Sequence, residues 1–154
     1  MEAITNFIRI TDTSGVVQGR YQNGKTGATI TLDSEDYSYL AFMYRGATRN
    51  RTGDNLEAEL ILSSNQLAMS IGAQAVQSKW NAKVTTCTMN PTTFAVGRKL
   101  MEDSWLTASL SYDMDALTVL LSSGIDAVGA NAPTRVLTTN LVGQLPSTAS
   151  ISNR

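Results

Sequence analysis

The stretch from Asn55 to Met89, NLEAELILSSNQLAMSIGAQAVQSKWNAKVTTCTM, changes its hydrophobic period twice. At its start, apolar residues recur at every second position with glutamates between them, as in a strand with one buried face: Leu56, Ala58, Leu60 and Leu62. From about residue 64 to residue 78 the apolar residues follow a helical spacing, and residues 80–90 return to β-forming side chains. The stretch therefore predicts a strand, a helix and a second strand in succession.

The predicted helix covers about residues 64–78. Ser64 or Asn65 can cap its first backbone amides. Gly72 costs about 1 kcal/mol of helix stability relative to alanine, so we expect tight packing here, with the glycine letting a neighbouring backbone approach. One stripe of residues at helical spacing is the predicted packing face: Leu67, Ile71, Gln74 or Ala75, and Ser78.

The sequence before this stretch also contains strand signals. Residues 5–11 are rich in β-forming side chains, and residues 27–33 alternate, with Ala28, Ile30 and Leu32 on one face. The region between them is full of glycine, and its NGKTG sequence predicts a turn. Residues 33–46 carry apolar side chains at both parities, which predicts a strand covered on both faces.

A hairpin is predicted after the central stretch. Pro91 ends the strand at residues 80–90, and residues 104–123 divide into two alternating segments around a turn at residues 113–115. Apolar residues in the second segment share one face: Leu117, Val119 and Leu121.

Strands dominate this pattern, and the helix is a single insertion. We therefore expect a mainly β fold, a barrel- or sandwich-like domain with one inserted helix at about residues 64–78. A chain of 154 residues fits one domain. Residues 1–130 are the expected β domain, and residues 131–154 are an extended C-terminal strand or arm of the same structural unit.

The composition argues for a surface shared with other chains. Charged residues make up 16% of the sequence, against roughly 25% in typical soluble domains. Small secreted β domains can also have a low charge, but shared surface is favoured. The net charge of −1 offers no global field for nucleic acid or an anionic membrane, so binding to either is not expected. The sequence contains no apolar run of about 18 residues and no signal-peptide pattern at its start, so we expect synthesis in a cytoplasm without use of secretion machinery.

The sequence gives little support for catalytic or metal-binding chemistry. The sequence has no histidine, which removes the usual general base and the usual zinc ligand. Cys87 is the only cysteine, so we expect it to be a small core residue rather than part of a disulfide or a multi-cysteine metal site. The protein is therefore expected to be non-enzymatic and to bind no cofactor.

Three further motifs have a functional and a structural interpretation. Asp113 and Asp115 could bind a cation, but a hairpin turn is favoured because no further acidic cluster accompanies them. The Gly-Lys-Thr sequence at residues 24–26 is followed by a β pattern instead of the helix that a phosphate-binding loop requires. Aromatic residues in strand patterns could stack on sugars or bases, but core packing is favoured: Trp80, Trp105 and Tyr112.

The basic residues of the YRGATRNRTG segment are interface candidates. They could contact phosphate, or they could lie in a solvated loop or pair with charges across a subunit contact. A contact between subunits is favoured over nucleic acid, since there is no second basic stripe. The residues are Arg45, Arg49 and Arg51.

The last part of the chain, SSGIDAVGANAPTRVLTTNLVGQLPSTASISNR, has few charges for an exposed tail. We expect an arm whose main chain pairs with the sheet edge of a neighbouring subunit, with Pro133 and Pro146 ending the pairing. The alternative is a last strand of the same domain followed by a tail. The arm would fill pockets with its apolar side chains: Val136, Leu137, Leu141, Val142 and Leu145.

The order of these segments resembles the tail-tip and baseplate hub proteins of tailed bacteriophages. A strand ending in Asn65 leads to a helix, a Trp80-bearing strand follows, and paired strands ending LTVLLSSGIDAV precede the late segment APTRVLTTNLVG. The sequence is most similar in this order to the N-terminal domain of the minor tail protein L and distal-tail group. The resemblance covers roughly residues 28–146 and rests on the order and general character of these segments, not on a diagnostic motif.

The resemblance implies a structural, non-enzymatic protein of the virion. It would form part of a ring, threefold or sixfold, that links the tail tube to the central spike and contacts other tail or baseplate proteins. Longer relatives add a cysteine-rich domain resembling a metal-cluster site, and with Cys87 alone no cluster is carried over. The alternatives are a head–tail connector or capsid decoration protein, and a carbohydrate-binding or hydrolytic β module that uses Trp80, Trp105 and the Asp113–Asp115 pair.

Overall fold

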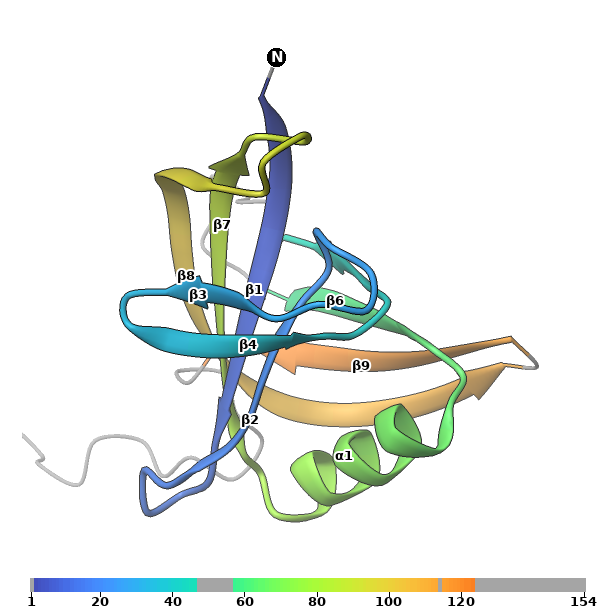
Figure 1. Cartoon of the computed structure of the whole chain (residues 1–154). Helices are drawn as coiled ribbons and strands as arrows, with labels where there is room; N and C mark the ends of the chain where they lie inside the picture. The colour runs from blue at the N-terminus through green and yellow to red at the C-terminus, as the bar shows by residue number, and fades with distance from the viewer. Residues whose placement is uncertain (1, 47–56, 114, 124–154) are drawn as a thin grey trace, which may run out of the picture.

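The computed structural model describes residues 2–46, 57–113 and 115–123. Within these residues the chain forms nine strands and one helix (Figure 1). In chain order they are β1 (Ala3–Thr11), β2 (Val17–Gln22), β3 (Ile30–Leu32), β4 (Glu35–Tyr39), β5 (Phe42–Arg45), β6 (Glu57–Ser63), α1 (Gln66–Gln77), β7 (Asn81–Met89), β8 (Val96–Asp113) and β9 (Ala116–Ser122). The expected mainly β fold with one inserted helix is confirmed.

The strands form a single mixed sheet in the order β3-β4-β2-β1-β7-β8-β9-β6-β5. Only β2 and β4 pair in parallel among the described strands. β4 and β5 lie near opposite ends of this order, although only two residues separate them along the chain. At this junction the Leu40 N–H donates to the Gln22 carbonyl over 3.0 Å, and the Asn23 side chain donates to the Phe42 carbonyl over 3.2 Å. The sheet therefore curls back on itself like a barrel instead of forming two separate layers.

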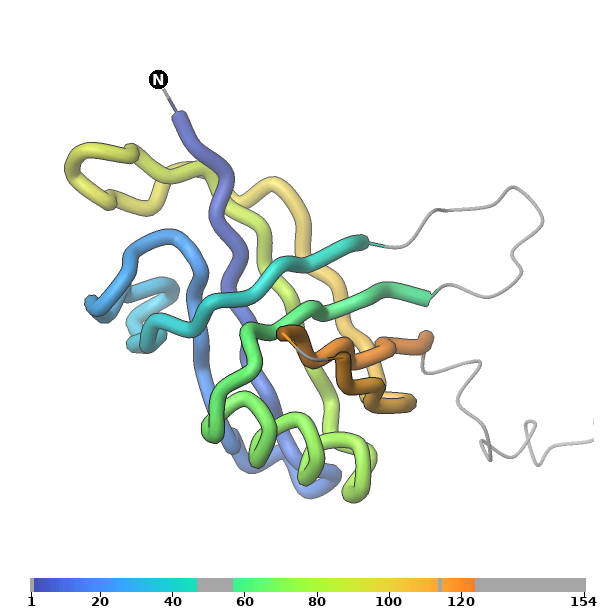
Figure 2. The backbone as a smooth tube through the Cα atoms, turned by 90° about the vertical axis from the view of Figure 1, so that its right-hand side faces the viewer, coloured from blue at the N-terminus to red at the C-terminus, as the bar shows by residue number. Residues whose placement is uncertain are grey.

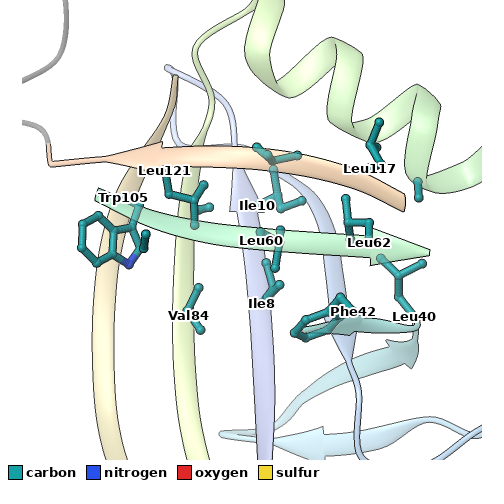
Figure 3. Close-up of a cluster of buried hydrophobic side chains, with 14 residues drawn as sticks. Ile8, Ile10, Leu40, Phe42, Leu60, Leu62, Val84, Trp105, Leu117 and Leu121 are labelled. Atoms are coloured by element: carbon teal, nitrogen blue, oxygen red, sulfur yellow. The ribbon is translucent and has the colours of Figure 1, made fainter. Parts of the chain in front are cut away.

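The main core lies where one part of the curled sheet crosses another. β6 and β9 run crosswise over β1 and β7, which Figures 1 and 2 show from two directions. The side chains between them point toward one another in Figure 3 and come from elements far apart in sequence. Buried members of this cluster include Ile8, Ile10, Leu60, Leu62, Val84, Trp105, Leu117, Val119 and Leu121.

A second core covers the other face of β1. Its buried residues come from β1, β3, β4 and β7: Phe7, Ile30, Leu32, Tyr37, Cys87 and Met89. The Phe7 and Tyr37 rings meet edge to face, with centroids 5.2 Å apart. Because β1 is covered on both faces, its sequence shows little alternation. Cys87 is buried here as expected, and this burial raises the pKa of its thiol.

α1 is capped by Asn65, whose side chain accepts a hydrogen bond of 2.7 Å from the Ala68 N–H. The buried residues of the helix are Ala68, Gly72 and Ala75. The predicted stripe was right for Ala75 and for Ile71, which is partly buried against the main core, and wrong for Leu67, which is 50% exposed, and for Ser78, which is also exposed. Small side chains form the packing face because large leucines of the β8–β9 hairpin occupy the space beneath it.

Gly72 makes room for this packing, but the backbone approach that was expected there is not observed. A Cβ atom at this position would lie 3.0 Å from a δ-carbon of Leu117 and 3.3 Å from one of Leu110. The elements that approach the glycine do so through leucine side chains and not through their backbone. No helix among the described residues has the length and apolar character to span a bilayer.

Three further expectations are corrected. Residues 33–46 form two strands, not one strand covered on both faces: Tyr37 faces the second core, Phe42 faces the main core, and Met43 is 56% exposed. The chain crosses between the two cores at Leu40 and Ala41, which gives the sequence apolar residues at both parities. The glycine-containing segment before residue 23 also forms a strand, β2, and β8 begins at Val96, earlier than its alternation indicated.

Candidate assembly surfaces

The structure places one of the sequence-predicted interface residues, Arg45. Its side chain lies on β5, is 63% exposed, and pairs with Glu59 of β6 over 3.4 Å. An exposed ion pair of this kind contributes little to stability. Arg49, Arg51 and the predicted C-terminal contact residues lie outside the described residues: Val136, Leu137, Leu141, Val142 and Leu145.

The tryptophans do not form a stacking platform. Trp105 is buried, as expected, and its indole N–H donates to the Tyr44 hydroxyl over 2.9 Å. Tyr44 in turn donates to Asp103 over 3.2 Å. Trp80 is half-buried against the main core. Tyr112 was expected in the core, but it lies near the end of the projecting β8–β9 hairpin and is 59% exposed.

Tyr44 provides a test of this partly buried chain of hydrogen bonds. Burial, followed by the nearby Asp103 carboxylate, raises the pKa of Tyr44 from 10.0 to about 12. Between these values the folded protein keeps the phenol proton and the unfolded chain loses it, so the free energy of unfolding should decrease as the pH rises from 10 to about 12. Burial also raises the pKa values of Tyr21 and Tyr37, so an absorbance titration of tyrosinate should lose only part of its late change in Tyr44→Phe. Tyr112→Phe should leave the late change in place, and a late change of the same size in Tyr44→Phe and in the unaltered protein would contradict the assignment.

The Asp113–Asp115 pair and the Gly-Lys-Thr sequence at residues 24–26 lie in turns, as interpreted from the sequence. Asp113 pairs with Ala116 across the end of the β8–β9 hairpin, as the turn interpretation requires. The described residues contain no group of three or more His, Cys, Asp or Glu side chains that could hold a metal ion. The Gly-Lys-Thr segment follows Gln22, whose side-chain carbonyl accepts from the Gly24 and Lys25 amides, and the next element is strand β3.

The charged side chains on the outer face of the sheet largely neutralise one another. Glu35 lies 3.2 Å from Arg9 and 3.0 Å from Arg20. Glu102 lies 2.7 Å from Lys83 and 3.2 Å from Lys99, and hydrogen bonds from these lysines lower the pKa of its carboxyl. This face is therefore a network of paired charges and not a basic surface for nucleic acid.

The outer face of α1 has an unusual composition for exposed helix. A surface helix of a globular protein normally carries charged residues opposite its buried stripe. Here none of the twelve helical residues is charged, and Leu67 and Met69 are 50% and 45% exposed. The exposed residues of this face are Gln66, Leu67, Met69, Ser70, Ala73, Gln74 and Gln77. Such a surface suits contact with another protein better than contact with water.

β8 presents an open sheet edge. β7 pairs with β8 from Val96 to Leu106, and β9 pairs with the opposite edge of β8 only from Leu106 to Asp113. On the β9 side, no described strand lies beside residues 96–104. In Figures 1 and 2 this first part of β8 runs along the border of the sheet, with β7 on one side. We call residues 96–104 the open edge of β8.

Exposed apolar residues accompany this edge. Leu100 and Met101 are 51% and 41% exposed. On the same sheet face as Met101, the register places Thr86, Thr88 and Ile4, and Ile4 is 70% exposed. The sequence pattern does not indicate the open edge, because the GRKLMED segment, which lies around two register shifts, does not alternate as a regular strand does. For the outer face of α1, the signal in the sequence was that the helical segment carries no charged residue.

The comparisons with known proteins identify a similar fold. No protein-family model matches the sequence, and no curated protein matches it. Among solved structures, the chain is similar to a chain described as "Virion of native gene transfer agent (GTA) particle", with a TM-score of 0.52 and 13% sequence identity. The likeness covers 87% of this chain and 44% of that chain, so the present chain spans less than half the length of its structural neighbour.

Proposed function

We propose that the protein is a non-enzymatic structural component of a phage-like virion. The single observation that carries the proposal is the likeness in fold, over 87% of this chain, to a chain of a gene transfer agent virion. Within the particle, the proposed position is the tail tip or baseplate hub, in a ring of threefold or sixfold symmetry between the tail tube and the central spike. The resemblance in segment order to tail-tip hub proteins supports this position.

The surface of the protein supports an assembled state. The chain is 16% charged, the outer face of α1 carries no charge, and apolar side chains are exposed on β1, β5 and β8. Surfaces of this composition are costly to leave in water and gain free energy when another chain covers them. Copies of the same chain and other tail or baseplate proteins are the proposed partners.

The alternative of a carbohydrate-binding module has less support. Sugar-binding aromatic residues need an exposed ring face, and Trp105 is only 7% exposed, with its N–H already bonded to Tyr44. Asp113 and Asp115 lie at the end of the β8–β9 hairpin, and the described residues contain no group of three or more His, Cys, Asp or Glu side chains that could hold a metal ion.

The test is to locate the chain in purified particles. An antibody to an epitope tag, or density assigned by electron microscopy, should place the chain at the tail tip. Placement at the head–tail junction or on the capsid would favour the connector or decoration alternative. A chain that is absent from particles and monomeric by light scattering would refute the proposal.

A further inference from the structure

The C-terminal end of α1 lies beside the last described residues of the chain. The Thr107 hydroxyl of β8 donates to the Ala75 carbonyl, in the last turn of α1, over 2.7 Å. Leu106, the residue before Thr107, pairs with Ser122, which ends β9. In Figures 1 and 2, β9 ends toward the C-terminal end of α1. The chain therefore continues beyond Ser123 from a point next to the helix.

The outer face of α1 extends from this point as an uncharged surface. None of the twelve residues of the helix is charged, and the Leu67 and Met69 side chains on this face are half exposed. On the sheet beneath, Tyr112 pairs with Leu117, which lies under α1, and the Tyr112 side chain is 59% exposed. The helix and the neighbouring hairpin thus present apolar surface that gains free energy when a further segment covers it.

The chain beyond β9 contains one segment suited to this surface. Residues 134–145, TRVLTTNLVGQL, lie between Pro133 and Pro146 and carry a single charge. Residues 124–133, GIDAVGANAP, contain glycine, asparagine and proline, which are typical of a linker. The apolar side chains of the segment are Val136, Leu137, Leu141, Val142 and Leu145.

The linker is long enough to carry the segment along the whole helix. Its ten residues, 124–133, span up to about 33 Å when extended, and a helix of 12 residues is about 18 Å long. A short flexible tether holds the segment near the helix at an effective concentration in the millimolar range. A second copy at micromolar concentration competes poorly with a segment held this close, so contact within one copy is favoured.

The open edge of β8 is a poorer site for the same segment. Residues 96–104 carry four charged side chains, and the pairing of β8 with β7 shifts register twice. Charged side chains, lysine above all, and irregular register are features that protect a sheet edge from pairing. The outer face of α1 has no charge to obstruct a covering segment. The charged residues of the edge are Arg98, Lys99, Glu102 and Asp103.

We propose that residues 134–145 fold back over the outer face of α1 in the same copy of the chain. Apolar side chains are buried on both surfaces, and only one charged group of the segment has to remain in water. The exposed apolar side chains of β1, β5 and β8 stay available to partner chains. Because the contact lies within one copy, this inference does not rest on the proposed function.

A thiol placed on the helix face tests whether it is covered. The native Cys87 is fully buried, so Gln74→Cys, at an exposed position of α1, provides the reactive thiol. Adding Leu141→Asp should raise the alkylation rate of this thiol at least about tenfold, because a covered thiol reacts only when its cover opens. Adding Thr148→Asp, which puts the same charge beyond Pro146, is the matched control and should leave the rate unchanged. Tryptophan fluorescence verifies that each variant is folded.

A second experiment distinguishes contact within one copy from contact between copies. The full chain with both Gln74→Cys and Leu141→Cys is oxidised mildly at low concentration and separated on a non-reducing gel. A disulfide within one copy should form at least about tenfold faster than in the control pair Gln18→Cys and Leu141→Cys, because proximity raises the effective concentration of the two thiols. Gln18 is exposed on β2, away from α1.

The contrary results have separate meanings. Disulfide-linked dimers in place of linked monomers would overturn the contact within one copy. Equal disulfide rates in the two cysteine pairs, or an alkylation rate that Leu141→Asp does not change, would overturn the docking of the segment on α1. None of these results bears on the virion role, which localisation in purified particles tests independently.

Discussion

Gln22→Met is expected to lower the free energy of unfolding by about 3–5 kcal/mol, since each buried polar group left without a partner costs about 1–3 kcal/mol. Gln22 is fully buried, and its side chain organises the turn that follows β2. Its amide nitrogen donates to the Lys25 and Ala28 carbonyls over 2.9 Å each. Its carbonyl oxygen accepts from the Gly24 and Lys25 amides over 2.7 and 2.8 Å. Methionine has nearly the same length and supplies none of these four hydrogen bonds.

Urea unfolding followed by tryptophan fluorescence measures this effect. Gln18→Met is the matched control, because Gln18 lies on the same strand, is exposed, and has one side-chain bond, to Asp12. The control should change the free energy of unfolding by less than about 0.5 kcal/mol. If Gln22→Met changed it as little as the control, the turn would not depend on the buried amide.

Leu121→Ala is expected to reduce the free energy of unfolding by about 3–4 kcal/mol, in the range measured for buried leucine truncations. Leu121 is fully buried on β9, where it pairs with Ala58 of β6 and Thr107 of β8. It therefore lies at the crossing of the curled sheet, where rigid strands on several sides limit the collapse of a cavity. Figure 3 shows its side chain directed into this cluster.

Leu120→Ala is the control for this prediction. Leu120 is adjacent on the same strand, points to the opposite face and is only partly buried. Its truncation should cost about 1 kcal/mol or less. Thermal and urea unfolding of both variants provide the comparison, and equal losses would show that the crossing is not the centre of the core.

Only some features of the candidate assembly surfaces could be predicted from the sequence. The low charge of the whole chain indicated surface shared with other chains, and the interior stretch QLAMSIGAQAVQ showed no charge on any face of the helix. The position of the open edge could not be predicted from the sequence, because it depends on where β9 ends along β8. β9 ends opposite Leu106 while β8 continues to Val96, and this difference in strand length arises only from the pairing of the two strands.

The burial and partners of some side chains also depend on residues distant in sequence. Gln22 looks like an ordinary polar residue before a turn, yet the folded chain buries it completely. Its burial results from the parallel approach of β4 to β2 and from the turn that wraps around its amide. Tyr44 and Trp105 come together across 61 residues of sequence, which no local pattern could predict.

The sequence by itself determined the local structures with a strong period. Alternation at Ala58, Leu60 and Leu62 and again at Leu117, Val119 and Leu121 specified strands with one buried face, because side chains alternate across a strand. Asn65 and the helical spacing after it specified the start of α1. Only the tertiary structure decided which face of that helix is buried, how the strands close into one curled sheet, and which edge stays open. These features depend on how closely distant elements can approach, as Gly72 against Leu117 shows, and neighbouring residues in the sequence do not contain that information.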